Sequence, residues 1–282
     1  MGFQGLRVVS VESRRAELVR RLVEDEGGFC FNAPSLRERP IEDNPAAIAF
    51  AERLIAGEYD AVFFNTGVGT GFLLDVVRAR DVLEPFLEAL GKVQVIVRGP
   101  KPTAALRPYR VPIAVHVPEP NTWREALEVM PPVEGRRIAV QEYGVPNNEL
   151  LEELRRRGGQ VEAVPVYRWD LPEDLAPLKE AARRIAAAEC DAAMFFSSIQ
   201  IVHLLQAAES PQQREAIVES MRSRLAVASI GPVTTEALEG AGVEPDFAPD
   251  HPKMAICIRQ FAEAAPDLLA RKRQAALASG RG

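Results

Sequence analysis

The stretch GLRVVSV, from Gly5 to Val11, returns 130 residues later as GRRIAVQ, from Gly135 to Gln141. Two further stretches repeat in the same order at nearly the same spacing: YDAVFFNTGVG, with Asp60, returns as CDAAMFFSSIQ, with Asp191, and RGPKPTAAL, with Gly99, returns as IGPVTTEAL, with Gly231. Because this period is far longer than that of a solenoid repeat, it predicts two copies of a whole domain. Two similar domains create a cleft, which is a favoured place for a small molecule to bind.

The composition is that of a globular protein that binds neither nucleic acid nor a membrane. The chain has 282 residues, of which 47% are apolar and 26% charged, and its net charge is −6. Its surface as a whole therefore does not attract phosphate backbones or anionic lipid. No stretch reaches the roughly 18 apolar residues of a membrane span, and charged residues come too early after Met1 for a signal peptide. We expect a cytoplasmic protein with a small-molecule ligand.

The residues that usually hold metals or cofactors are scattered. The three cysteines and three histidines lie in separate segments without the spacing of a metal, redox or disulfide framework. The glycine-rich stretch from Gly67 to Gly71, GVGTG, lacks the Lys-Ser/Thr that follows in a phosphate-binding loop, and no GxSxG motif is present. We expect no metal, no cofactor and no covalent nucleophile.

Short apolar strands alternate with amphipathic helices along the chain. LRVVSV, for example, leads into RRAELVRRLVEDEG, where Gly27 and Gly28 end the helix, and DAAMFFSS leads into IQIVHLLQAA. The strands are continuous apolar runs, which is typical of strands buried on both faces. The pattern predicts an α/β protein with parallel sheets and helices on both sides.

Two proline-containing stretches, NAPSLRERPIEDNP (Asn32 to Pro45) and VPVYRWDLPEDLAP (Val164 to Pro177), lie at matching places in the duplication. If the chain crosses between the domains at both, two adjacent strands connect them. One domain then consists of residues 1–38 and 170–265, and the other of residues 43–166. Residues 266–282 are basic and rich in small residues, which predicts a flexible tail.

Small and hydroxyl residues follow several of the expected strands. In a doubly wound sheet the carboxyl ends of the strands and the N-termini of the helices face one crevice, where backbone N–H groups bind carboxylates. The same residue types also cap helices and form turns, which is the alternative for each position taken singly. We predict substrate binding for the set that occurs in both halves: Asn65, Thr66, Gly67, Tyr143, Gly144, Ser197, Ser198 and Gly231.

Three basic residues lie near these strand ends. Arg98 and Lys101 share one strand-to-helix turn, and Arg14 stands at the start of the first expected helix, where a cation is unfavourable with the helix dipole. We expect the three residues to bind anionic groups of the ligand. A solvated charged surface is the alternative.

YDAVFFNTGVG, VPVYRW and IGPVTTEALEGAGVEPDFAP, set in a duplicated α/β unit, together resemble the uroporphyrinogen-III synthase family, from Leu6 to about Ala264. The resemblance implies two flavodoxin-like domains joined by a two-stranded connector. It also implies a lyase that needs no cofactor, dehydrates linear hydroxymethylbilane and closes it to uroporphyrinogen III with inversion of the last pyrrole ring. The many carboxylates of that substrate suit a cleft lined with backbone donors, and the sequence is compatible with a monomer.

The resemblance also assigns individual residues. Tyr167 matches the family's proposed acid, although a tyrosine in a connector is commonly a packing residue, and Thr234 matches the threonine of the G-P-x-T segment. In the first half that threonine belongs three residues after Gly99, where this chain has Pro102, and the nearest threonine is Thr103. The resemblance thus implies that Tyr167 and Thr234 are catalytic and that Thr103 binds substrate.

A modest acid suffices for this reaction, because the ring nitrogen stabilises the azafulvene left when the hydroxyl departs. The harder task is to hold the bilane so that attack occurs at the substituted carbon, since unassisted closure gives the type I ring. Two alternatives stay open. One is a non-catalytic protein of the same fold that senses a tetrapyrrole or another small anion, which Pro102 favours, and the other is a hinge-type anion-binding protein.

Overall fold

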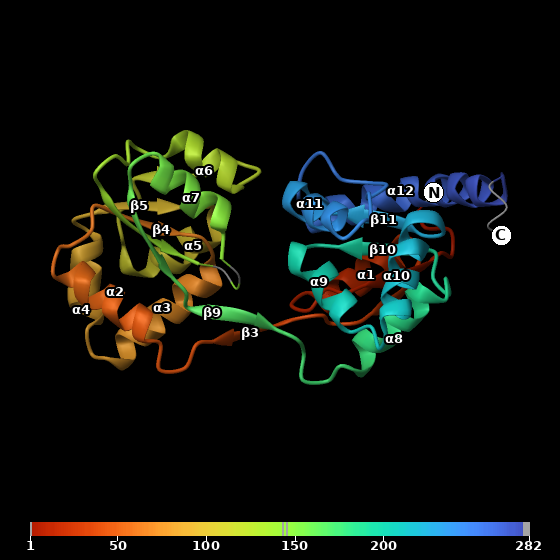
Figure 1. The fold of residues 1–282 in the computed structure, drawn as a ribbon, viewed down its shortest axis with the longest axis horizontal. Helices are drawn as coiled ribbons and strands as arrows, with labels where there is room; N and C mark the ends of the chain where they lie inside the picture. Colours follow the sequence, from red (N-terminus) through yellow and green to blue (C-terminus); the bar gives the residue numbers. More distant parts are fainter. Residues whose placement is uncertain (1, 143, 145, 279–282) are drawn as a thin grey trace. The chain divides into compact units, whose positions relative to one another are not determined.

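The computed structural model of the protein describes residues 2–142, 144 and 146–278. The chain forms two compact units: the terminal unit, Met1–Arg37 with Asp170–Gly282, and the central unit, Glu38–Trp169. Each unit has a parallel sheet covered by helices, which confirms the predicted α/β fold class (Figure 1). None of the helices within the described residues is long and apolar enough to cross a bilayer.

The central unit is built on a five-stranded sheet with the order β6-β5-β4-β7-β8. All neighbouring strands in it run parallel. The chain moves outward from β4 to β6 and then returns to β7, so the order reverses between β4 and β7. Ligands of such sheets bind beyond the carboxyl ends of the strands at this reversal point. The strands are β4 (Ala61–Phe64), β5 (Gln94–Val97), β6 (Val115–His116), β7 (Arg137–Gln141) and β8 (Gln160–Val164).

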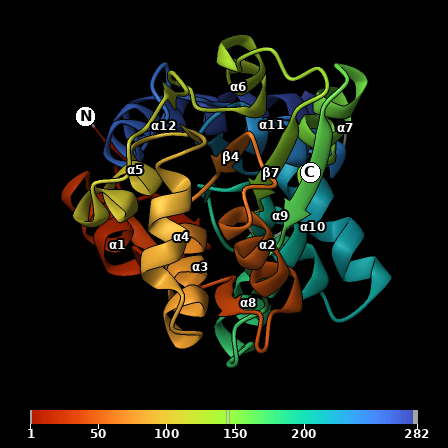
Figure 2. The same cartoon turned by 90° about the vertical axis from the view of Figure 1, so that its left-hand side faces the viewer.

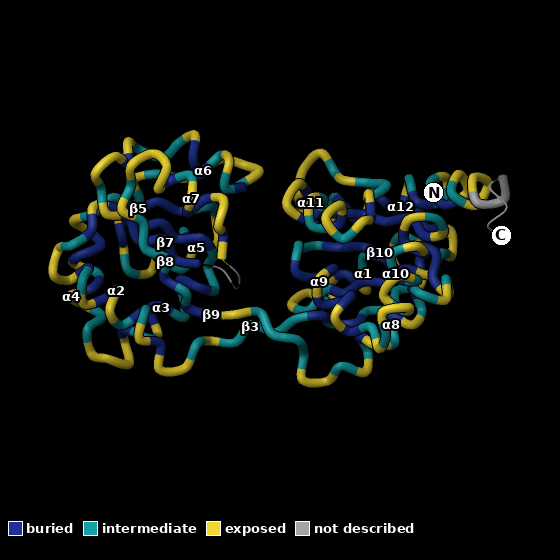
Figure 3. Tube along the Cα trace, in the orientation of Figure 1, coloured by how far each residue is buried: buried dark blue, intermediate teal, exposed yellow. Residues whose placement is uncertain are grey.

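Helices cover both faces of the central sheet, because successive side chains of a strand point to opposite faces. Val62 and Phe64 pack on the side of α2 (Pro45–Ile55), α3 (Gly67–Ala79) and α4 (Leu83–Leu90). Figure 2 shows α3 and α4 side by side there. Phe63 packs on the side of α6 (Trp123–Val129) and α7 (Asn148–Arg156). β4 is therefore buried throughout, as Figure 3 shows. The helix α5 (Pro100–Leu106) and the 3-10 helix η1 (Arg107–Tyr109) follow β5.

The terminal unit repeats this plan with strands from both ends of the chain. Its sheet has the order β11-β10-β1-β2, again with parallel neighbours. The strand order reverses between β10 and β1, which correspond in the duplication to β4 and β7 of the central unit. The strands are β1 (Arg7–Ser10), β2 (Phe29–Asn32), β10 (Ala192–Phe195) and β11 (Ala226–Ser229).

The helices of the terminal unit also form two layers. Val9 and Phe195 pack on the side of α8 (Ala176–Ala186), α9 (Ser198–Gln206) and α10 (Pro211–Ser223). Val8 and Met194 pack on the side of α1 (Ala16–Asp25) and α12 (Met254–Ala278). The helix α11 (Pro232–Gly240) follows β11. The alternation of strand residues between the two layers explains why β10 is apolar at every position.

One hydrogen bond occurs in both units and shows the duplication in atomic detail. The backbone N–H of Arg7 donates to the Asp191 carboxylate at 2.9 Å, and the N–H of Arg137 donates to Asp60 at 2.8 Å. In the terminal unit the guanidinium groups of Arg7 and Arg273 also bind Asp191, at 3.0 and 2.8 Å. The repeated sequences therefore form the same local structure, to which the terminal unit adds ion pairs.

The two stretches rich in proline contain a separate two-stranded sheet of β3 (Arg37–Pro40) and β9 (Tyr167–Asp170). Both boundaries between the units fall within these strands. The sequence places Tyr167 in the connector, at the end of the second strand of the second half of the duplication, and of these two assignments only the strand is wrong. β8 ends at Val164, and Tyr167 begins β9. Pro165, which has no N–H to donate to a strand ladder, separates the two strands.

The prediction of a flexible tail from residue 266 is wrong for the described residues up to 278. The helix α12 continues through Pro266 to Ala278. Leu269 is only 2% exposed, and Lys272 binds Asp246 at 2.7 Å. Lys272 and Arg273, two of the basic residues that suggested a solvated tail, instead fasten this helix to the terminal unit.

Candidate functional site

In the central unit, Thr66, which caps α3, contacts Tyr167, the first residue of β9. Thr66 is the N-cap of α3, and its Oγ1 accepts the N–H of Gly69 at 3.0 Å. The same oxygen lies 3.3 Å from the hydroxyl oxygen of Tyr167. Tyr167 is 3% exposed, and its ring contacts Phe72 of α3 and Trp169 of β9. These ring contacts fix the direction of the phenol, which meets Thr66 at the reversal point of the sheet.

Gln141, the last residue of β7, binds the residues that precede α3. Its main-chain oxygen accepts from the Asn65 side chain at 2.7 Å, and its Oε1 accepts the N–H of Thr66 at 3.3 Å. Its Nε2 donates to the carbonyl of Glu142. Gln141 is 1% and Asn65 2% exposed. This buried amide therefore links the two strands on either side of the reversal point.

Because Gly69 has no side chain, the Gln141 amide can pack against the start of α3. A Cβ at Gly69 would stand 2.1 Å from Nε2 of Gln141, whereas a Cβ at Gly71, on the same helix, would meet nothing within 4 Å. Sequence reasoning did not identify Gln141 or Gly69 as site residues. The available signal was the glycine-rich stretch after β4, whose first and third residues, Gly67 and Gly69, serve close packing.

Gly67 brings the start of α3 against the start of α5. A Cβ at Gly67 would lie 2.7 Å from the carbonyl oxygen of Lys101. Arg98, in the same turn as Lys101, is half-buried, and Lys101 is exposed. Thr103 donates its hydroxyl to the carbonyl of Gly99 at 2.9 Å. The structure thus places the basic turn beside the turn of Thr66 and Gly67, at the positive ends of two helix dipoles.

Gly144, which follows β7, is close-packed against β9. Gly144 has a left-handed φ of +65° and forms a bridge with Arg168 of β9, and a Cβ there would stand 2.4 Å from the Trp169 ring. Packing therefore explains this glycine, while its contact with substrate stays a prediction. Glu142 is 8% exposed, and burial raises the pKa of its carboxyl. Tyr143 lies outside the described residues.

In the terminal unit the corresponding turn is held differently. Ser197 occupies the place of Thr66 in the duplication, but its hydroxyl makes no cap hydrogen bond. Instead the side chain of Gln200 accepts the N–H of Phe196 at 2.6 Å and donates to Glu12 at 2.9 Å. Ser198 begins α9 and is half-buried. Gln200 of α9 aligns with Gly69 of α3. The glutamine that holds the turn therefore lies on the helix in the terminal unit, whereas Gln141 lies on the strand β7 in the central unit.

The turns after β5 and β11 show how the two halves differ. Gly99 and Gly231 have nearly the same φ, 166° and 165°. Thr234 is buried in α11, and the equivalent buried position of α5 holds Pro102. Thr103 therefore matches Thr235 in the structure and not Thr234. Because the threonine of the first half stands one residue later, a proline occupies the buried position in α5 where α11 has a threonine.

Arg14 lies in the loop between β1 and α1 and is exposed. It was expected to open the first helix, but α1 begins at Ala16, with Arg15 as its N-cap residue. Arg14 and the predicted residues Ser197, Ser198, Gly231 and Thr234 belong to the terminal unit, whereas the other described site residues belong to the central unit.

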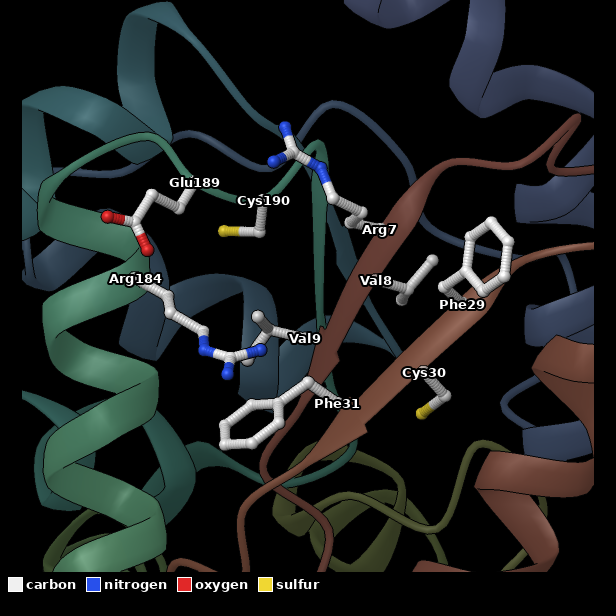
Figure 4. A pocket seen from close by; sticks show the side chains of 9 residues that line it. All are labelled: Arg7, Val8, Val9, Phe29, Cys30, Phe31, Arg184, Glu189 and Cys190. Atoms are coloured by element: carbon white, nitrogen blue, oxygen red, sulfur yellow. The ribbon is translucent and has the colours of Figure 1, made fainter.

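A surface pocket of about 170 Å³ lies elsewhere, along β1 and β2 of the terminal unit (Figure 4). The guanidinium of Arg184 lies 4.0 Å from the centre of the Phe31 ring at this pocket. Burial raises the pKa of the Cys30 and Cys190 thiols to about 12, so neither is a thiolate at neutral pH. None of the predicted site residues lines the pocket. Among the described residues, no cluster of three or more His, Cys, Asp or Glu side chains is placed to hold a metal.

Comparison with known proteins relates this chain to one family. A sequence model of the family described as Uroporphyrinogen-III synthase HemD matches residues 16–259. The chain is 27% identical over 270 residues to the protein YjjA of Bacillus subtilis strain 168, covering 93% of this chain and 97% of that relative.

Two solved structures of uroporphyrinogen III synthase from the extremely thermophilic bacterium Thermus thermophilus are similar in fold. A mutant form has a TM-score of 0.72 at 24% identity and covers 93% of this chain and 100% of its own. The wild type in a second crystal form has a TM-score of 0.55 at 26% identity and covers 93% of this chain and 99% of its own. With the family model matched over most of its length, the chain belongs to the uroporphyrinogen-III synthase HemD family.

Proposed function

We propose that the protein is a uroporphyrinogen-III synthase, a lyase of porphyrin and heme biosynthesis. It removes water from hydroxymethylbilane and closes the ring with inversion of the last pyrrole, giving uroporphyrinogen III. The family match over residues 16–259 carries the proposal. The contact between Tyr167 and Thr66 at the reversal point of the central sheet supports it, because it places a fixed hydroxyl donor where ligands of such sheets bind.

Tyr167 is the proposed acid for the departing hydroxyl. The carbon–oxygen bond breaks as the phenol proton moves to the hydroxyl, and water leaves an azafulvene that the pyrrole nitrogen stabilises. A phenol is acidic enough for this step, since the cation it helps to form is already stabilised. The chain's larger contribution is to hold the bilane so that the new bond forms at the substituted carbon of the last ring.

The carboxylates of the bilane are the proposed ligands of the strand ends. In the central unit we assign them to Asn65, Thr66, Gly67, Arg98, Lys101, Thr103 and Gly144, and we keep Tyr143 in this set. In the terminal unit we assign them to Arg14, Ser197, Ser198 and Gly231, with Thr234 in the catalytic role that the family resemblance implies. Helix N-termini and exposed cations are suitable donors for such carboxylates.

Arg98→Ala and Lys101→Ala are each expected to raise KM for hydroxymethylbilane about fivefold at low salt, because a charge that stays in contact with solvent contributes up to about 1 kcal/mol. The effect should shrink as salt screens the charge. Lys92→Ala is the control: it removes the same charge just before the same strand, β5, and should leave KM unchanged. A KM that stays at the wild-type value for both variants at every ionic strength rules out this role.

A non-catalytic protein that senses a tetrapyrrole is the second candidate, and the buried Pro102 at the place of Thr234 is the observation that favours it. The two candidates differ in turnover. Mixing the purified chain with fresh hydroxymethylbilane should produce uroporphyrinogen faster than spontaneous closure if the chain is a synthase. Binding of the bilane without acceleration would favour the sensor.

A further inference from the structure

We propose that Gln141 is a positioning residue for Tyr167 and that it acts through Thr66. The kinetic part of this inference rests on the proposed function, while the contacts and the spectroscopic test do not. Gln141 touches no reacting group in the proposal. It holds the backbone of Thr66 so that the threonine hydroxyl donates a hydrogen bond to the phenol.

The Thr66 hydroxyl can donate that hydrogen bond, which is the direction that a proton donor at Tyr167 requires. A hydroxyl has one proton to donate and two lone pairs to accept with. The N–H of Gly69 occupies one lone pair of Thr66 at 3.0 Å, and the hydroxyl proton can then point to the Tyr167 oxygen at 3.3 Å. A hydrogen bond donated to a phenol oxygen favours the ionised form and makes the phenol a better acid.

Gln141 fixes the backbone on which this arrangement depends. Thr66 is extended, with φ −139° and ψ 148°, as an N-cap residue must be to direct its side chain at the first turn. The Gln141 amide accepts the N–H of Thr66, and its main-chain oxygen binds the side chain of the preceding Asn65. Because Gln141 is 1% exposed and fills the space left by Gly69, it has little freedom to move.

The terminal unit provides an internal comparison. There the strand position equivalent to Gln141 is Val11, and the helix position equivalent to Gly69 is Gln200. The hydroxyl of Ser197 caps nothing and has no hydrogen-bond partner among the described atoms. The segment from Asn32 to Arg37 that follows the second strand contains no tyrosine. The amide on the strand and the capped hydroxyl thus occur in the unit that has a tyrosine to orient.

The test is NMR of protein labelled with ¹³Cζ-tyrosine, in which Tyr167→Phe assigns one of the four tyrosine signals. Gln141→Met keeps the bulk but removes the amide, and Thr66→Val removes the hydroxyl. Both should shift the Tyr167 signal, and both should lower kcat about fivefold, as expected for the loss of one hydrogen bond. Gln141→Met removes no proposed substrate ligand and should therefore leave KM nearly unchanged. Thr66→Ser, which keeps the hydroxyl, should retain the wild-type Tyr167 signal.

Ser210→Ala is the matched control for stability. Ser210 caps α10 by accepting the N–H of Gln213 at 3.1 Å, so its loss should lower the stability of the protein about as much as the loss of the Thr66 cap. It should leave the Tyr167 signal and kcat unchanged. If folded Gln141→Met and Thr66→Val both keep the wild-type Tyr167 signal, the positioning role is wrong. If the signal shifts but the wild type does not turn over hydroxymethylbilane, the positioning role stands and the proposed function fails.

Discussion

Tyr167→Phe is expected to lower kcat for hydroxymethylbilane about 10²-fold while the fold stays intact. Loss of a positioned acid typically costs a factor of about 10² to 10⁴, and the low end applies because the azafulvene also forms spontaneously. Phe keeps the ring contacts with Phe72 and Trp169, so the packing is preserved. The product should still be mainly the type III isomer, since the strand ends and not the phenol hold the bilane.

Tyr59→Phe is the control for this experiment. Tyr59 belongs to the same hydrophobic cluster of the central unit, and its hydroxyl donates to Glu162 at 2.5 Å. Its replacement should reduce stability by about 1 kcal/mol and leave kcat unchanged. A fully active Tyr167→Phe would reduce Tyr167 to a packing residue. A variant that makes mainly the type I ring would assign Tyr167 to folding the substrate instead of proton transfer.

Asp191→Ala is expected to destabilise the terminal unit by about 3 kcal/mol, while Asp60→Ala, its duplicate in the central unit, should cost less than about 1 kcal/mol. Breaking a buried ion pair costs about 3 to 5 kcal/mol, and exposure of the arginines places Asp191 at the low end. Asp191 is buried and binds Arg7 and Arg273, whereas Asp60 is exposed. Urea denaturation of the two variants measures the difference, and equal losses would contradict this explanation.

The effect of Asp191→Ala should depend on pH. Burial alone would raise the pKa of Asp191, but the hydrogen bonds and positive charge of Arg7 outweigh it and hold the pKa below the ordinary value of 3.8. The stabilisation is therefore fully present above about pH 4 and is lost as the pH falls through the folded-state pKa. The stability difference between wild type and variant should be constant from about pH 5 to 7 and shrink as the pH falls below the ordinary pKa of 3.8. A difference that persists undiminished in stronger acid would show that the charge is not its cause.

The architecture could be predicted from the sequence because its signals are local and occur twice. Continuous apolar strands such as AVFF and AAMF require helices on both faces, and the glycines at the helix ends mark the limits of each repeat. The tail could not be predicted, because its basic residues look solvated until the distant partners Asp191 and Asp246 are known. Likewise, sequence alone did not reveal that β8 ends before Pro165 and that a new strand begins at Tyr167.

The candidate site could be predicted only in part. Thr66 and Gly67 were identified from their place after a strand, and the structure brings Thr66 to Tyr167 and Gly67 to Lys101. The same structure shows Thr66 capping α3, which was the alternative for that position. Gln141 could not be found by comparing the two halves, because its counterpart, Gln200, comes from a different element. When a contact is made by a strand residue in one half and by a helix residue in the other, the sequence does not repeat that residue at matching positions.

The isomer composition of the product tests the central claim most directly. The full chain is incubated with freshly prepared hydroxymethylbilane, the products are oxidised, and the type I and type III uroporphyrins are separated and compared with a reaction without protein. We predict that type III dominates with the protein and type I without it. A product ratio equal to that of the protein-free reaction, at a protein concentration that binds the bilane, would contradict the assignment as a uroporphyrinogen-III synthase.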